Sequence, residues 1–565
     1  MKNITSGLRQ EERRKQLIIL GAGTMQGPAI SIAKEMGLET IVADGDSGAP
    51  CAPFADRFER IDLKDKEGVE ALARDLKAGG RLAGIMTAGT DFSATAAWVA
   101  ERLGLPGIPY ETALDASDKG RMRLRFRAAG VPSPEFLTLS EMPPEASAFP
   151  FDFPAVVKPV DNMGGRGCRR VDSRRDLAPA LGEAVKFSRS GRAIVEEYMD
   201  GPEFSVDALV YHGEITICGL ADRHIYFPPY FIEMGHTMPT NLDEKEAASL
   251  LAVFIEGVKA LGLLDKNAVG AAKGDVKLCS RGPMIGEIAA RLSGGYMSGW
   301  TYPYASGVEV TRGAIQAAIG QRPDCLDVTR SWTCAERAFI SIPGRVRSIR
   351  GLRNAKAAPY VKDIFLRAEE GGRVIFPENN VSKCGNVLAA APGRKSAMDA
   401  ADSAARAVLI RLEAPDEATA AFLDAEPASG GGVWPPDAFS VSPAVIAALA
   451  RLPDPAVRAE VPPGTGIAPE PALVPFPAFT ESGLKDHAGR GVEESLEAVR
   501  ALTGLSLPVA FPDRAAADVR LLGRRFWVAL IRGGYQGAAY VADLLCGGKP
   551  GVSGAGKDAE EAGNG

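Results

Sequence analysis

The stretch from Val156 to Val171 reads VVKPVDNMGGRGCRRV, and its order of residues limits what the surrounding fold can be. An apolar run ends in a lysine and a proline, a glycine-rich loop follows, and another apolar position comes after two arginines. A P-loop places its lysine after the glycines and ahead of a helix, whereas Lys158 precedes the glycines here and residues 168–172 favour a strand. The stretch therefore predicts two strands joined by a mobile loop, not a P-loop.

The bulk composition excludes several classes of protein. With 565 residues the chain is too long for a single core, and three or more domains are expected. A net charge of -6 and a pI near 5.6 give no reason to expect nucleic acid as a partner. The 8 cysteines are scattered without a C-x-x-C pair, which favours reduced thiols over disulfides or a zinc site. The apolar run at 17–20 is too short for a signal peptide or a membrane span, so we expect a cytoplasmic protein.

Short apolar runs alternate with helix-length segments in the N-terminal part of the chain. Strands are expected at 17–20, 40–43, 57–62 and 83–88, with helices at 27–37, 66–78 and 92–103. Such alternation is typical of a parallel, doubly wound sheet, so we predict a Rossmann-like domain. The turn from Gly21 to Gly27 has one residue too many for the dinucleotide fingerprint, and we interpret it as a tight strand-to-helix turn.

Charged residues in the middle of the chain form four successive features. They are Lys119, Lys158 before the loop, the acidic group Glu196, Glu197 and Glu203, and the pair Asp275 and Glu287 followed by Arg291. Each feature alone has a structural explanation, because lysines after strands and glutamate pairs are usually solvated. Together, the phrases ASDKGRMR, PAVVKPVDNMGGRGCRRV, IVEEYMDGPEFSVD and IGEIAARLSGGYMSG resemble the ATP-grasp superfamily over about residues 15–415.

This resemblance implies that ATP binds between two α+β lobes, the smaller of which spans about residues 135–198. Two lysines would contact the phosphates because a buried polyanion needs opposite charge within hydrogen-bond distance. Glycines would let backbone N–H groups approach phosphate oxygens closely and let the loop act as a lid. The positions that match the family's nucleotide-binding residues are Lys119 and Lys158 (phosphates), Gly164, Gly165 and Gly167 (lid), Glu196 with the neighbouring Glu197 (adenine) and Glu203 (ribose).

The resemblance also implies a site for Mg²⁺ or Mn²⁺ at Asp275 and Glu287. Carboxylates suit Mg²⁺, which is hard and usually holds few protein ligands besides phosphates and water. Many family members read Glu-x-Asn-x-Arg, with the asparagine as a further ligand, whereas this chain has Ala289 between Glu287 and Arg291. Water can replace the lost amide oxygen, so we still expect metal binding, and the number of ions stays open.

A second resemblance concerns the substrates. The segment 230–242, YFIEMGHTMPTNL, is similar to the substrate loop of L-amino-acid ligases, and residues 335–415 resemble the C-terminal subdomain of that group. By this resemblance Glu233 would lie near an amino group and His236 near the substrate carboxylate or acylphosphate, although a histidine there also has a structural explanation. Tyr296 would line the acceptor pocket.

Arg291 would hold the acylphosphate or the tetrahedral intermediate, since catalysis in this family rests on charge neutralisation and positioning. A structural salt bridge between Arg291 and Glu287 is the alternative.

The implied activity is that of an ADP-forming ligase, which activates a small carboxylate, such as an amino acid, as an acylphosphate and joins it to an amine. Two alternatives stay open. Activation of bicarbonate, as in biotin carboxylase or carbamoyl-phosphate synthetase, is disfavoured because the chain has no biotin-carrier segment and no fused glutaminase. A weakened ATP-binding protein is favoured only by Ala289. The expected partners are small molecules and a second copy of the chain, with neither nucleic acid nor membrane.

We therefore predict a multidomain protein of mixed α/β and α+β class. The C-terminal piece can be a docking or dimer element or a small domain, with Phe526, Trp527, Tyr535 and Tyr540 in its own core. The predicted segments are a Rossmann-like domain at 15–117, an ATP-grasp domain at 118–330, a β-rich subdomain at 331–415, a Pro/Gly-rich linker at 416–480, a small C-terminal domain at 481–547 and a disordered tail at 548–565.

Overall fold

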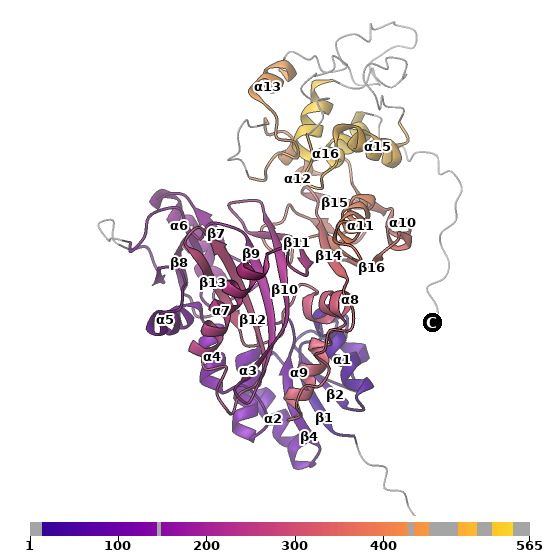
Figure 1. The fold of residues 1–565 in the computed structure, drawn as a ribbon. Coiled ribbons are helices and arrows are strands. Elements are labelled where there is room, and N and C mark those ends of the chain that lie inside the picture. Colours follow the sequence, from indigo (N-terminus) through magenta and orange to yellow (C-terminus); the bar gives the residue numbers. More distant parts are fainter. Residues whose placement is uncertain (1–13, 144–148, 428–433, 451–483, 506–522, 546–565) are drawn as a thin grey trace, which may run out of the picture. The chain divides into compact units, whose positions relative to one another are not determined.

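The chain separates into two compact units in the computed structural model (Figure 1). The first unit comprises residues 1–336, 378–380 and 388–399, and the second comprises 337–377, 381–387 and 400–565. The structure describes residues 14–143, 149–427, 434–450, 484–505 and 523–545. The predicted tail at 548–565 and much of the predicted linker lie outside the described residues.

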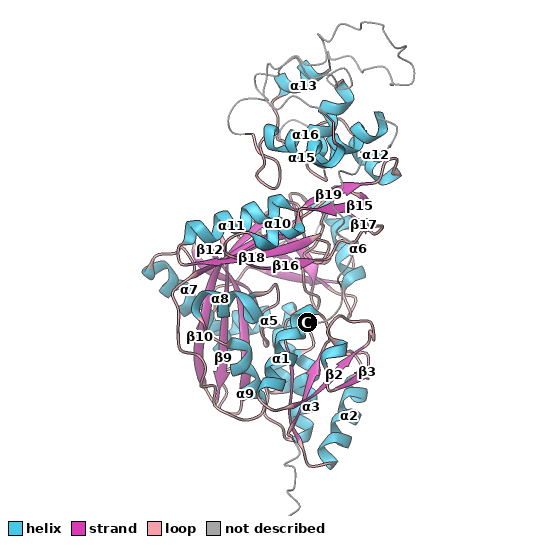
Figure 2. Cartoon of the chain, turned by 90° about the vertical axis from the view of Figure 1, so that its right-hand side faces the viewer, coloured by secondary structure: helices cyan, strands magenta, loops and turns pink. Residues whose placement is uncertain are grey.

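A four-stranded parallel sheet of order β3-β2-β1-β4 begins the first unit. Its strands are β1 (Gln16–Leu20), β2 (Glu39–Asp44), β3 (Arg57–Arg60) and β4 (Leu82–Thr87). Successive side chains of β1 point to opposite faces, so that Ile19 packs in the core on the side of α1 and Ile18 in the core on the side of α2 and α3. Figure 2 shows the strands beside these helices, which are α1 (Gly27–Glu35), α2 (Lys66–Ala78) and α3 (Ser93–Leu103). The predicted Rossmann-like arrangement is confirmed.

The turn after β1 is filled by a side chain of its own. Gly21 has φ +100, and a Cβ there would lie 3.0 Å from the side chain of Gln26. The Oε1 of Gln26 accepts from the backbone N–H of Gly23 at 2.9 Å, and the N–H of Ala22 donates to Asp44 at 2.8 Å. The turn is thus a tight strand-to-helix connection, as interpreted from the sequence.

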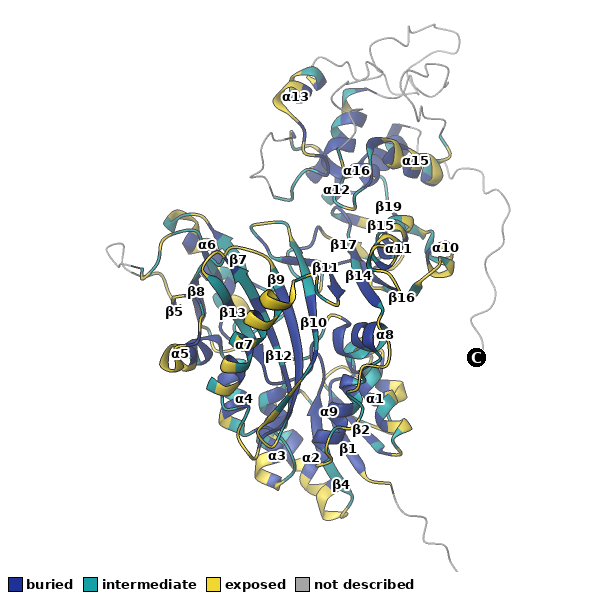
Figure 3. Ribbon diagram, viewed as in Figure 1, coloured by how far each residue is buried: buried dark blue, intermediate teal, exposed yellow. Residues whose placement is uncertain are grey.

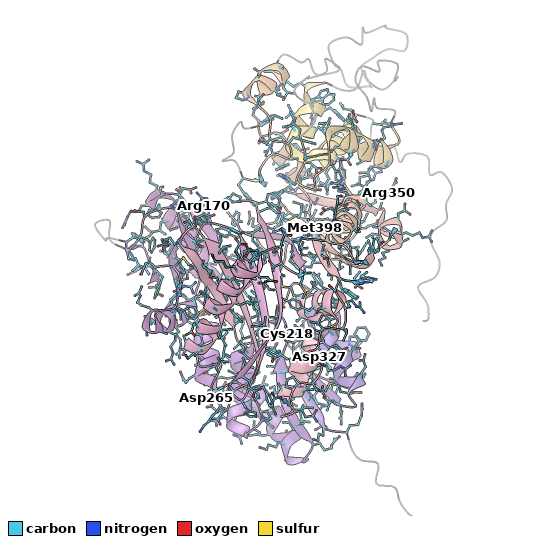
Figure 4. The ribbon with its side chains drawn as sticks, in the orientation of Figure 1. Arg170, Cys218, Asp265, Asp327, Arg350 and Met398 are labelled. Atoms are coloured by element: carbon cyan, nitrogen blue, oxygen red, sulfur yellow. The ribbon has the colours of Figure 1, made fainter. Side chains whose placement is uncertain are left out.

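The second sheet of this unit is small and has the order β5-β8-β6-β7. Its antiparallel strands are β5 (Phe136–Leu139), β6 (Ala155–Pro159), β7 (Arg169–Val171) and β8 (Ala193–Glu197), next to η3 (Arg174–Asp176) and α6 (Leu177–Phe187). Val157 pairs with Arg169, so two strands do flank the glycine-rich loop. The Arg170 guanidinium, labelled in Figure 4, lies 4.8 Å from the ring centre of Tyr198.

The third and largest sheet contains the run β13-β12-β9-β10-β11. These strands are β9 (Glu203–Tyr211), β10 (Glu214–Tyr226), β11 (Ile232–Met238), β12 (Val269–Cys279) and β13 (Gly282–Ala289), and the order continues with β14 (Thr333–Phe339) and β18 (Gly385–Ala391). Helix α7 (Glu244–Ala260) packs against it and is capped by Asp243, which accepts from the N–H of Glu246 at 2.8 Å. Figure 3 shows β9 largely buried, β10 largely of intermediate exposure, and exposed residues on the outer side of α7.

Strand β11 corrects one sequence interpretation. Residues 230–242 were expected to form a substrate loop, but 232–238 form a strand paired antiparallel with β10. All seven residues of this strand are buried. The remaining helical elements of the unit are η1 (Thr24–Gln26), η2 (Ala52–Phe54), α4 (Tyr110–Ser117), α5 (Lys119–Ala129), the π-helix η4 (Met297–Thr301), α8 (Tyr302–Ser306) and α9 (Val310–Ala318).

The second unit packs helices around a three-stranded sheet of order β17-β15-β19. The aromatics Phe526 and Trp527, each 1% exposed, lie in its hydrophobic core with residues of α15, as expected of core residues. Helix α11 (Arg394–Ala407) begins in the first unit and ends in the second. The other elements of the second unit are β15 (Gly344–Arg350), α10 (Leu352–Ala357), β16 (Val361–Leu366), β17 (Arg373–Val374), β19 (Leu409–Leu412), α12 (Glu417–Leu423), α13 (Pro443–Leu449), α15 (Val492–Thr503) and α16 (Arg524–Leu545).

The packing of α7 on the large sheet gives a test of the fold. Phe254 is fully buried, and a Cβ at Gly274 would lie 2.5 Å from its ring, so helix and sheet are in close contact. We expect Phe254→Ala to lower the free energy of unfolding by about 3–5 kcal/mol in urea denaturation, because it leaves a cavity. Leu124→Ala, at a side chain 58% exposed, should change it by less than about 0.5 kcal/mol. Equal losses in both variants would contradict this packing.

Candidate active site

Lys119 begins helix α5 and points into the first unit, where it contacts the large sheet. Its side chain is 5% exposed, and its Nζ lies 3.2 Å from Oε1 of Glu287 and donates to the carbonyl of Asn162 at 2.8 Å. The helix starts here because Asp118 caps it, accepting from the N–H of Arg121 at 3.0 Å. One lysine thus joins three predicted parts: the helix, the glycine-rich loop region and the acidic strand β13.

Lys158 at the end of β6 forms a second, more deeply buried charge cluster. Its Nζ lies 2.7 Å from Oε2 of Glu196, and Nε of Arg123 lies 2.8 Å from Oε1 of the same carboxylate. Burial would raise the pKa of Glu196, but the two cations outweigh it and lower the pKa. Arg123 comes from α5 and was not singled out from the sequence. The carboxylate of Glu196 is therefore held by two cations from different elements.

Glu197, the neighbour of Glu196, is directed elsewhere. Successive side chains of a strand point to opposite faces, and the Glu197 carboxylate lies 2.5 Å from the guanidinium of Arg281. The structure brings Glu196 into the charge cluster and leaves Glu197 at a half-buried edge.

The glycine-rich loop between β6 and β7 is positioned from both ends. Gly164, Gly165 and Gly167 have φ of 71, 77 and 65, a region in which residues with a Cβ are strained. The carbonyl of Gly164 accepts from the N–H of Asn380 at 2.8 Å. Asn380 in turn accepts, through Oδ1, from the N–H of Glu233 at 2.8 Å. The loop is thereby linked to strand β11.

One face of the large sheet carries alternating acidic and basic side chains. The pattern follows from the pairing of the strands. Glu203 of β9 lies opposite Lys277 of β12, and Asp275 of β12 lies opposite Glu287 of β13. Side chains on one face of a sheet recur every second residue, which adds Lys273 to this row. The two predicted metal-ligating carboxylates are therefore cross-strand neighbours.

Arg223 on β10 connects three of the predicted residues. Its guanidinium pairs with Glu203, lies 2.7 Å from Oε2 of Glu233, and lies 2.7 Å from Oδ1 of Asp275. Burial would lower its pKa, but the three carboxylates raise the pKa well above its usual value. Sequence analysis missed this residue, and the only signal was its place in the alternating pattern of β10.

Glu287 is influenced by several cations of the site. Burial opposes ionisation of its carboxyl group, but the ammonium groups of Lys119 and Lys273, followed by those of more distant cations, lower its pKa to about 2. Lys273 also pairs directly with Asp275. Glu287 is thus ionised, and the carboxylates of Asp275 and Glu287 each lie beside a lysine, an arrangement that suits a divalent cation.

Arg291 lies just beyond β13, is 8% exposed, and donates to the carbonyl of Leu292 at 3.0 Å. Among the described residues no ion pair joins it to Glu287, which does not support the alternative of a structural salt bridge. The next residue but one, Ser293, donates its N–H to the buried Asp207 at 3.1 Å. The segment after β13 is therefore fixed by the sheet beneath it.

Glu233 and His236 lie three residues apart on β11, with the ring of His236 completely buried. Nε2 of His236 is 2.6 Å from the hydroxyl of Thr301, and Nδ1 is 3.4 Å from Glu336 and 3.9 Å from Glu233. Tyr296 is also buried, and its ring packs edge-on to that of Trp300 at 5.6 Å. These buried residues thus belong to β11 and to η4 with its neighbour Tyr296, and Glu233 also pairs with Arg223.

The described residues contain no group of three or more His, Cys, Asp or Glu side chains that could hold a metal ion by itself. Two carboxylates, Asp275 and Glu287, are nonetheless a fitting set for Mg²⁺, which commonly takes one or two carboxylates and completes its shell with phosphates and water.

Two family models match the chain. Residues 151–298 match the ATP-grasp domain, and residues 338–413 match the L-amino acid ligase C-terminal domain 2. The chain carries an ATP-grasp domain. This confirms the predicted family resemblance. The matched range contains the loop at 161–167 and the strands of Asp275 and Glu287, whereas the phrase ASDKGRMR lies ahead of it.

Known proteins similar to this ATP-grasp chain extend the comparison. It is 26% identical over 408 residues to the uncharacterized protein y4rH of Sinorhizobium fredii, covering 70% of this chain and 82% of that protein. It is 25% identical over 339 residues to carnosine synthase 1 of Homo sapiens, covering 55% of this chain but only 40% of that protein. The crystal structure of L-amino acid ligase from Bacillus licheniformis has a TM-score of 0.62 at 21% identity, over 71% of this chain and 100% of that chain, which shows a shared fold. The chain is thus similar to ATP-grasp carboxylate–amine ligases.

The described part of the chain contains no helix long and apolar enough to cross a membrane.

The low pKa of Glu287 predicts how acid affects stability. The folded state keeps this group ionised down to about pH 2, whereas the unfolded chain takes up the proton near the ordinary value of 4.5. Its ionisation therefore stabilises the fold above pH 4.5, and this contribution is lost as the pH falls towards 2. We expect the melting temperature to fall more steeply from pH 5 to pH 3 in the wild type than in Glu287→Gln. Glu256→Gln, at an exposed position of α7, should keep the wild-type slope, and equal slopes in all three proteins would contradict the assignment.

Proposed function

We propose that this chain is an ATP-dependent ligase that activates the carboxylate of an amino acid or a similar small molecule and joins it to an amine, releasing ADP and phosphate. One observation carries the proposal. Lys119 of α5 pairs with Glu287 of the large sheet's carboxylate pair, and Lys158, which lies at the end of β6 just before the glycine-rich loop, pairs with Glu196 and also helps to lower the pKa of Glu287. This combination suits a triphosphate with a divalent cation, and the ATP-grasp match supports it.

The phosphates of the nucleotide would replace carboxylates as partners of the two lysines. Both lysines are held by carboxylates, Lys119 by Glu287 and Lys158 by Glu196, so their ammonium groups are positioned before any phosphate arrives. Backbone N–H groups of Gly164, Gly165 and Gly167 would cover the phosphates. Glu203 is proposed for the ribose hydroxyls, and Glu196 and the neighbouring backbone for the adenine. Mg²⁺ held by Asp275 and Glu287 would supply charge that draws electrons from the transferring phosphoryl group.

The reaction would proceed in two transfers. A carboxylate oxygen of the first substrate attacks the γ-phosphorus, the bond to the bridging oxygen of ADP breaks, and an acylphosphate forms. The amine nitrogen then attacks the carbonyl carbon, loses a proton, and displaces phosphate. Arg291 would stabilise the oxygens that gain charge in these steps, while Glu233 and His236 would orient the substrates from β11. The similarity to L-amino acid ligase and carnosine synthase 1 supports a ligase of this class.

A screen of phosphate release tests the proposed class directly. Purified protein with Mg²⁺ and ATP is assayed against pooled amino acids, then against bicarbonate, and products are identified by mass spectrometry. We expect ADP and phosphate only with an amino-acid pool, together with a new amide. Release with bicarbonate alone would indicate the carboxylase alternative. Tight ATP binding without release would indicate the weakened binding protein that Ala289 favours.

Two substitutions in the small lobe extend this assay. Lys158→Ala removes a proposed phosphate contact, and Lys186→Ala is the matched control. Lys186 lies on α6 and is exposed, so its loss should leave turnover unchanged.

Arg291 provides a second prediction. We expect Arg291→Met to lower kcat by about 10²–10³-fold, because removal of one donor that stabilises a developing oxyanion has an effect of that size. The affinity for ATP, measured by calorimetry, should change little, since the arginine would act on the acyl group. A loss of ATP affinity with unchanged kcat would contradict this role.

A further inference from the structure

Lys273 occupies a place on the acidic face of the large sheet that the proposed reaction does not account for. Its ammonium pairs with Oδ2 of Asp275, while the guanidinium of Arg223 lies 2.7 Å from Oδ1 of the same carboxylate. Both oxygens of this predicted metal ligand therefore face a cation that belongs to the sheet itself. The side chains of Lys273 and Asp275 are each only 14% exposed, so this contact is shielded from solvent.

The neighbouring strand shows why a lysine fits here. Lys273 is the cross-strand partner of Ala289, and directly opposite residues in an antiparallel pair have Cβ atoms about 4.5–5.5 Å apart. Ala289 lies two residues beyond Glu287 and so faces the same side of β13. A methyl group there offers no oxygen to a metal ion and leaves room for the long side chain of Lys273. The position next to the carboxylate pair thus holds an ammonium group in place of an oxygen ligand.

The two lysines that touch the pair differ in where they come from. Lys119 belongs to α5 and also donates to the loop carbonyl of Asn162, so it can transfer its contact to a phosphate. Lys273 and Asp275 are two residues apart on β12, so their side chains lie on the same face and pair directly. The register partner of Lys273 on β9 is Asp207. Burial raises the pKa of the Asp207 carboxyl group, and the charge of Lys273 opposes this rise.

We propose that Lys273 acts as a built-in second cation, so that the chain takes up one divalent ion per bound nucleotide and not two. This inference rests on the proposed function, since it concerns the metal complex of a bound nucleoside triphosphate. Glu287 would be the main protein ligand of the single ion, with Asp275 held in place by Lys273 and Arg223. Lys273 is then a positioning and charge-supplying residue of the site.

Counting bound Mn²⁺ tests the inference without relying on turnover. Protein and AMP-PNP are mixed in equal amounts, well above their dissociation constant, and free Mn²⁺ is followed by electron paramagnetic resonance during titration. We expect one tightly bound Mn²⁺ per chain in the wild type. Ala289→Asn should also bind one, because Lys273 still covers the second position, whereas the double variant Lys273→Met/Ala289→Asn should bind two.

Lys277→Met is the matched control, because Lys277 lies on the same face of the same strand but donates to the carbonyl of Met199 at 2.9 Å. It should bind one ion. Two ions in the wild type, or one in a double variant that melts cooperatively and binds AMP-PNP, would overturn the role of Lys273 while leaving the ligase proposal intact. A wild-type chain that does not bind AMP-PNP would overturn the proposed function, and this inference with it.

Discussion

The balance of charge on one face of the large sheet is the constraint on which the rest of the site depends. The carboxylates of Glu203, Glu233, Asp275 and Glu287 meet several cations there. Each buried ion needs a partner because the cost of an uncompensated charge is several kcal/mol. Arg223 carries the largest share, as it contacts Glu203, Glu233 and Asp275 together. It ties predicted ribose, substrate and metal positions into one electrostatic unit.

The cations of the site fall into two groups by origin. Arg223 and Lys273 belong to strands of the sheet and pair with carboxylates of the same sheet. Lys119 and Lys158 come from α5 and the small sheet, and their carboxylate partners are the residues expected to meet the nucleotide and its metal. A triphosphate can therefore replace the carboxylate partners of Lys119 and Lys158 without disturbing the contacts of Arg223 and Lys273. This division explains how one surface can be stable alone and still receive a highly charged ligand.

Much of the fold was predictable because its signals are local. Alternating apolar runs indicated the doubly wound sheet, and the glycines of the loop at 161–167 have the positive φ that their residue type permits. Lys158, Asp275 and Glu287 could be singled out as candidates because their short sequence contexts resemble those of the family. Arg223 and Lys273 were missed, since their importance arises only from the register of β10 and β13 against their neighbours, which no short window contains. Strand β11 was not predicted for a related reason: the resemblance of residues 230–242 to a substrate loop does not reveal the pairing with β10.

The most direct test of this account is a crystal structure of the complex with Mg²⁺ and AMP-PNP. The account predicts that the Nζ of Lys119 leaves Glu287 for a phosphate oxygen, that Glu287 binds the metal ion, and that Arg223 keeps its contact with Asp275. An intact Lys119–Glu287 pair, with the nucleotide bound elsewhere on the chain, would contradict it.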